Sequence, residues 1–186
     1  MKNQPDKILL VLLFSALGLQ VTFAQQSRYD IVYQVQLAAY KDDVQWEKYR
    51  DLKDLGFVST QSIQIETPND ALVRVYLGKY LGLKTINHVL DELDDKGFDD
   101  MDIIKDTYKL KNDNGLNLVY TIQLGIFKKL DVQKFVDIPD LENLHIIYEN
   151  KQYKLIYGFF ENEEDASISL KNIEAEGYPG IVKKFR

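Results

Sequence analysis

The chain has 186 residues, of which 45% are hydrophobic and 28% charged, a length and composition that fit one large domain or two small ones with buried cores. Its formal net charge of −6 argues against nucleic-acid binding and against broad adhesion to anionic membranes, because both need a surplus of Lys and Arg. The absence of cysteine excludes disulfides, thiolate metal sites and a cysteine nucleophile.

Residues 1–24 have the three-part pattern of a secretory signal peptide. Two lysines give a basic start, residues 8–19 are an apolar run, and small residues precede the bond between Ala24 and Gln25. The apolar run is shorter than the roughly 20 residues that a membrane-spanning helix needs. We therefore expect signal cleavage at this bond and a periplasmic or otherwise exported protein that has no membrane association afterwards.

The next stretch, residues 29–108, has the element order βαββαβ. Residues 33–40 alternate apolar and polar side chains at period two, which predicts a half-buried strand. Trp46, Tyr49 and Leu52 follow at helical spacing, which predicts a helix with Trp46 in the core. The remaining elements are a strand over 62–66, a third strand that ends at Gly78, a helix that ends at Gly97, and a fourth strand over 101–105.

A polar, turn-rich linker over 109–117 separates this stretch from a second one of the same order, residues 118–186. Its first helix is shorter, and its last helix begins with Asn162 as a predicted N-cap before an acidic first turn. Strands are expected over 120–127, 144–148 and 180–184, with a third strand that ends at Gly158, a first helix that ends near Pro139, and a second helix that ends at Gly177.

The two stretches are copies of one repeat. Residues 33–40 (YQVQLAAY) match 120–127 (YTIQLGIF) at an offset of 87 residues. Residues 73–80 (VRVYLGKY) match 153–160 (YKLIYGFF) at an offset of 80, and the helices that follow keep this second offset. The sequence therefore predicts an α+β protein of two tandem ferredoxin/RNP-like βαββαβ modules, each a four-stranded antiparallel sheet with two helices on one face.

The motifs YTIQLGIF, YKLIYGFF and EEDASISLKNIEAEGY of the second copy resemble the SPOR domain, a small module of the bacterial envelope. The first copy resembles it less closely, since Ala38 replaces the glycine of the first motif. The resemblance implies an open sheet face that binds peptidoglycan glycan strands stripped of their stem peptides. It implies no catalysis, and it suggests a link to cell division.

The open sheet face supplies the candidate site. Alternate side chains of a strand lie on opposite faces, so the residues between the core positions should face outward. Amide and guanidinium groups can bond sugar hydroxyl and acetamido groups, and an aromatic face suits the apolar side of a sugar ring. The outward candidates for glycan binding are Gln34, Gln36, Arg74 and Tyr76 in the first copy and Thr121, Gln123 and Lys154 in the second.

Less demanding interpretations stand beside this one. An exposed antiparallel sheet face is normally polar and needs no ligand to explain its glutamines. The acidic residues between Asp91 and Asp102 lack the spacing of a calcium loop, which favours a solvated helix end. Glycoside hydrolysis needs a pair of carboxylates, and no such pair recurs in both copies. His88 and His145 lie in different copies, which argues against a catalytic or metal-binding pair.

We therefore expect a non-enzymatic peptidoglycan-binding protein of the cell envelope, without cofactor or metal. Its expected partners are glycan strands and envelope proteins, and not nucleic acid. The alternative is a protein-interaction module that kept the SPOR-like fold and lost the glycan site, as Ala38 suggests.

Overall fold

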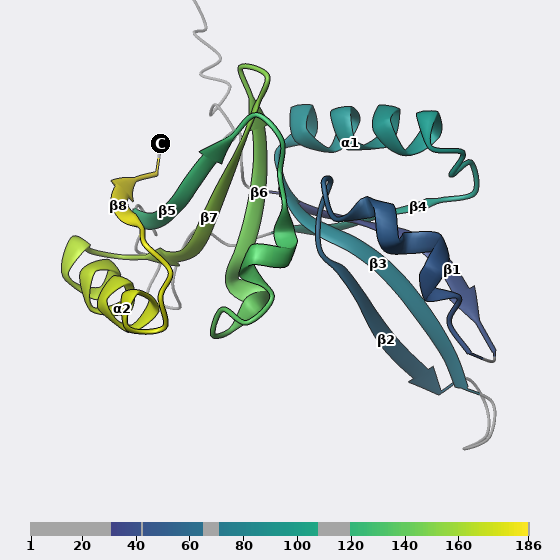
Figure 1. The fold of residues 1–186 in the computed structure, drawn as a ribbon, viewed down its shortest axis with the longest axis horizontal. Helices are drawn as coiled ribbons and strands as arrows, with labels where there is room; N and C mark the ends of the chain where they lie inside the picture. The colour runs from purple at the N-terminus through teal and green to yellow at the C-terminus, as the bar shows by residue number, and fades with distance from the viewer. Residues whose placement is uncertain (1–30, 42, 65–70, 108–119, 186) are drawn as a thin grey trace, which may run out of the picture.

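The computed structural model describes residues 31–41, 43–64, 71–107 and 120–185, so the expected signal segment and linker lie outside the described residues. These residues form an α+β fold around one mixed, mostly antiparallel sheet (Figure 1). We refer to residues 31–107 as the first half and to residues 120–185 as the second half. No helix among the described residues is long and apolar enough to cross a membrane.

The strands of the first half lie in the order β4-β1-β3-β2, and each pairs antiparallel with its neighbours. The strands of the second half lie in the order β8-β5-β7-β6, again with antiparallel pairs. The strand bounds are β1 Ile31–Tyr40, β2 Val58–Gln64, β3 Ala71–Leu81, β4 Asp102–Thr107, β5 Tyr120–Phe127, β6 Leu144–Glu149, β7 Gln152–Phe160 and β8 Ile181–Lys184.

The two halves share one continuous sheet, so the prediction of two separate four-stranded sheets was wrong. β2 pairs with β3 from Ala71 to Leu77, and β6 then pairs parallel with the same edge of β3 at Tyr80 and Ile146. β3 is longer than β2, which leaves its C-terminal end available to β6. Periodicity predicts which face of a strand is buried, but it does not predict which strand edge remains open.

The strand register repeats between the halves. The β1–β3 ladder and the β5–β7 ladder each contain two irregularities, at positions that differ by the same offset of 87 residues that relates the sequences. Bulges of this kind bend a strand and re-aim its side chains. The irregularities lie between Tyr33 and Val35 and between Gln36 and Ala38 in β1, and between Tyr120 and Ile122 and between Gln123 and Gly125 in β5.

The third strands continue past the glycines that we expected to end them. Gly78 and Gly158 have φ of 72° and 62°, so each kinks its strand in a conformation that favours glycine. Pairing nevertheless resumes beyond the kink, and β3 and β7 end at Leu81 and Phe160. The prediction mistook a kink within a strand for its end.

The helices differ in how well they match the predictions. α1 (Leu83–Asp95) and α2 (Glu163–Ala175) end just before Gly97 and Gly177, as expected. The side chain of Asn162 accepts a hydrogen bond from the backbone nitrogen of Asp165 at 2.8 Å, which confirms the predicted N-cap. The first helices are 3₁₀ segments: η1 (Trp46–Leu52), η2 (Val132–Phe135) and η3 (Leu141–Asn143).

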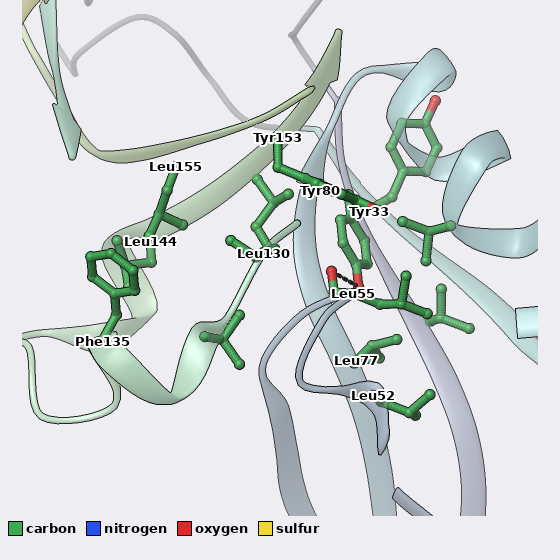
Figure 2. Packing of buried hydrophobic residues seen from close by; sticks show 14 of the residues in the cluster. Tyr33, Leu52, Leu55, Leu77, Tyr80, Leu130, Phe135, Leu144, Tyr153 and Leu155 are labelled. Carbon is green, nitrogen blue, oxygen red and sulfur yellow. Dashed lines mark hydrogen bonds between the residues drawn. The ribbon is translucent and has the colours of Figure 1, made fainter. Parts of the chain in front are cut away.

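One main hydrophobic core runs through both halves. Leu52, Leu77 and Tyr80 of the first half belong to the same buried cluster as Leu130 and Tyr153 of the second. Figure 2 shows Leu130 and Tyr153 beside Tyr80, whose hydroxyl donates to the carbonyl oxygen of Leu55 at 3.2 Å. The described part of the chain is therefore packed as a single unit.

Trp46 does not join this core, although its spacing predicted that it would. Its side chain is 53% exposed, while Tyr49 and Leu52 of the same segment are buried. Side chains three residues apart align in a 3₁₀ helix, so the helix type does not account for the exposure of Trp46, which is the first residue of η1.

Candidate functional site

The open face of the sheet is the face opposite the main core. Residues that pair directly across two strands point to the same side of a sheet, so the ladders define rows of side chains on this face. In the first half one row crosses four strands and consists of Asp102, Gln36, Tyr76 and Ser59. In the second half the corresponding row consists of Ile181, Gln123, Ile156 and His145.

The row of the first half is polar and contains one aromatic ring. Gln36 is half-buried, and its Nε2 donates to Oδ2 of Asp102 at 3.3 Å. Tyr76, the predicted aromatic surface, is only 8% exposed, although it lies on the predicted side of its strand. Arg74 is half-buried on the same face, and Gln61 is its partner across β2. Amide, carboxylate and guanidinium groups thus gather over β1, β3 and β4.

Gln34 lies where β1 bulges. It is half-buried, and its Nε2 donates to the carbonyl oxygen of Gly78 at 3.1 Å. This hydrogen bond ties the kink in β3 to its neighbour, which is a structural role.

The row of the second half is mostly apolar around Gln123. Gln123 is half-buried, and its two cross-strand partners are Ile181 and Ile156. Ile181 is 49% exposed, and Ile126, which lies on the same face opposite Lys154, is 47% exposed. The second half therefore offers fewer hydrogen-bonding groups on this face than the first half.

Thr121 is not available to a ligand, contrary to the prediction. Its side chain is 2% exposed, and its hydroxyl lies 2.7 Å from the carbonyl oxygen of Gly158, to which it donates. It therefore stabilises the kink in β7. Lys154 is half-buried and forms an ion pair with Glu149 at 2.6 Å, so its ammonium group is already engaged within the sheet.

A small apolar cluster on the open face was not foreseen. It joins Val32 and Leu81 of the first half to Ile147 and Ile156 of the second, with Phe159 and Phe185 packed against it. It lies at the junction of the two halves, where β3 meets β6. Strand periodicity places Ile156 on the outward side, but its burial follows from the shared sheet and could not be inferred from one strand.

His145 is buried at this junction. It is 2% exposed, its Nδ1 lies 2.9 Å from the carbonyl oxygen of Asn143, and its ring is tilted against Phe159. Burial lowers the pKa of His145 to about 4. His88 stacks on Tyr148 with ring centroids 3.6 Å apart, and its Nε2 lies 2.9 Å from the Tyr153 hydroxyl. Both histidines therefore serve packing between elements.

The open face of the first half offers amide, carboxylate and guanidinium groups that can form hydrogen bonds. Within the described ranges no group of three or more His, Cys, Asp or Glu side chains could hold a metal ion. The acidic residues between Asp91 and Asp102, at the end of α1 and just after it, are mostly exposed, as expected for a solvated helix end. No family model, no curated protein and no solved structure matches this chain.

Proposed function

We propose that this is an exported, non-enzymatic protein that binds peptidoglycan glycan strands on the open face of its sheet. The proposal includes two tandem βαββαβ modules that resemble SPOR domains, with a cleaved signal peptide before them and a periplasmic location. The motifs on β5, β7 and α2 support the resemblance.

One observation carries the proposal. Gln36 and Gln123 occupy equivalent positions in the two halves, each between two irregularities of its strand and each half-buried on the open face. A bulge changes the direction of the side chains beside it, so the same pair of bulges presents a glutamine amide in both halves. Amides can both donate to and accept from sugar hydroxyl and acetamido groups.

The first half supplies the larger set of hydrogen-bonding groups. Arg74 and Asp102 lie near Gln36 on this face, whereas Gln123 is flanked by isoleucines. We therefore assign the main glycan contacts to Gln36 and Arg74, with Gln123 as a second contact. This reverses the order of importance expected from the motifs.

The protein-interaction alternative has an observation of its own. Ile126 and Ile181 are large apolar side chains on the open face and are about half exposed. Exposed apolar side chains that gather on one face mark interaction surfaces. A protein partner that covered the second half would use these two residues.

Sedimentation with purified peptidoglycan sacculi tests the proposal. The samples are the wild type, Gln36→Ala, Gln123→Ala and the double variant. Gln45→Ala is the control, because Gln45 is exposed and lies outside the strands, just before η1. One lost hydrogen bond is worth about 0.5–1.5 kcal/mol, so each single variant should bind several-fold more weakly. The double variant should bind more weakly than either.

Circular dichroism of every variant shows whether the fold is kept. A folded double variant that sediments like the wild type would place the glycan site elsewhere. A wild type that does not sediment would favour the protein-interaction alternative, which Ile126→Ser and Ile181→Ser would then test in a search for envelope partners.

A further inference from the structure

A second candidate site lies between the halves and borders the open face only at Gln34 and Ser59. β2 and β6 follow each other along one edge of β3, and the segments before them leave a cleft of about 680 Å³. Clefts of about 300–1,000 Å³ are the usual size for small ligands. One wall comes from η1 and the loop after it, and the other wall comes from η2 and η3.

The exposed Trp46 belongs to this cleft. Its indole is 53% exposed on the first wall, and Val136, which is 42% exposed, lines the second wall. Leaving a large apolar side chain exposed forgoes the stabilisation that burial would provide. An aromatic ring exposed at a cleft offers a flat apolar surface to a ligand, and the CH face of a sugar ring is a surface of matching shape.

The charge of the cleft is opposite to that of the chain. Arg50, Lys53 and Lys79 line it, whereas Glu142 is its one lining carboxylate among the described residues. The whole chain carries a formal charge of −6. Cationic groups that converge in a cleft attract and orient an anionic ligand.

Lys79 also fixes the geometry of the cleft. Its Nζ donates to the backbone oxygen of Glu142 at 2.6 Å, which links β3 to the second wall. Burial lowers the pKa of Lys79, opposed by the nearby carboxylates of Glu142 and Asp106. Arg50 is more exposed and forms an ion pair with Glu47, so it can turn toward a ligand without loss of core packing.

From these features we infer that the cleft binds a carboxylated sugar, with the ring against Trp46 and the carboxylate at Arg50 and Lys53. The amide of Gln133, which is exposed on the second wall, is placed to bond ring substituents. This site goes beyond the proposed function, because it uses the junction of the halves and none of the open-face contacts Gln36, Arg74 or Gln123.

A fluorescence titration tests the inference directly, because Trp46 is the only tryptophan of the chain. The ligands are N-acetylmuramic acid and N-acetylglucosamine, which share a ring and an acetamido group but differ in the lactyl ether that carries the carboxylate. We expect N-acetylmuramic acid to change Trp46 emission saturably. N-acetylglucosamine should bind about tenfold more weakly, as the loss of one hydrogen bond to a charged group implies.

Arg50→Gln and Lys53→Gln are the variants, and Lys48→Gln is the matched control. Lys48 lies on the same 3₁₀ segment as Arg50, but its Nζ is over the Phe98 ring and does not line the cleft. Each cleft variant should weaken binding of N-acetylmuramic acid about tenfold, and the control should bind like the wild type.

Equal responses to the two sugars, or no response to either, would overturn the inference. Unchanged binding by both folded cleft variants would do the same. The outcome is independent of sacculus sedimentation. A protein that sediments but shows no Trp46 response supports the proposed function and contradicts this site. A protein that shows the Trp46 response but does not sediment supports this site and contradicts the proposed function.

Discussion

Alanine at Gly78 should destabilise the protein much more than alanine at Gly97. The two glycines have φ of 72° and 81°, so both substitutions carry left-handed strain of about 1–2 kcal/mol. A less flexible unfolded chain offsets about 0.4–1 kcal/mol of it. Only Gly78 is crowded, since a Cβ there would lie 2.2 Å from Cζ of Tyr80, while a Cβ at Gly97 would meet nothing within 4 Å.

The Tyr80 ring has little room to move away. It is fully buried and donates to the carbonyl oxygen of Leu55, and a Cβ at Gly56 would lie 2.4 Å from its hydroxyl oxygen. Overpacking costs about 1–3 kcal/mol, and loss of the hydrogen bond costs about 0.5–1.5 kcal/mol. The sum for Gly78→Ala is a loss of about 1.5–6 kcal/mol, against at most about 1.6 kcal/mol for Gly97→Ala. Crowding and the lost hydrogen bond alone separate the two variants by about 1.5–4.5 kcal/mol.

Urea unfolding followed by far-UV circular dichroism measures both losses from the midpoint and the slope. The predicted result is a clearly lower free energy of unfolding for Gly78→Ala than for Gly97→Ala. Equal losses would refute the reasoning, because they would mean that the Tyr80 ring does not pack against Gly78.

Three further predictions concern the core and the junction. Leu124→Ala should lower the free energy of unfolding in urea by about 2–5 kcal/mol, because Leu124 lies in the main core. Gln123→Ala, on the opposite face, should change it by less than about 0.5 kcal/mol. Similar losses for both variants would mean that the two faces of the strand are misassigned. Ile146 lies in the second half but pairs with β3 and belongs to the shared core. Ile146→Ala should therefore lower the urea midpoint of the unfolding transition that Trp46 fluorescence reports in the first half. An unchanged Trp46 transition would show that the halves unfold independently. Burial lowers the pKa of His145 to about 4, so the folded state favours the neutral imidazole. The stabilisation by neutral His145 is complete above about pH 6.5 and is lost as the pH falls toward 4. From pH 7 to 4.5 the wild type should therefore lose about 2–3 kcal/mol more than His145→Gln, and parallel pH profiles would contradict this.

Local features of the fold were predictable because they depend on neighbouring residues. The alternation in β1 and β5 gave the buried faces, and Asn162 with its acidic first turn gave the start of α2. The pairing of β3 with β6 was not predictable, because it depends on which edge stays open after each half has paired its own strands.

The same distinction applies to the candidate site. The outward direction of Gln36, Gln123 and Ile156 follows from strand periodicity. The burial of Tyr76 and Thr121 and the exposure of Trp46 depend on contacts between distant segments, which the spacing along one element does not reveal. The repeat in the sequence does correspond to a repeat in the structure, since the bulges of β1 recur in β5 at the offset of 87 residues.

Sedimentation of the wild-type protein with two sacculus preparations tests the central claim most directly. One preparation is treated with an amidase that removes the stem peptides, and the other is left intact. If the sheet face binds glycan strands, more protein should sediment with the treated sacculi, and added soluble glycan strands should compete. Equal absence of the protein from both pellets, with its fold intact by circular dichroism, would contradict the proposed function.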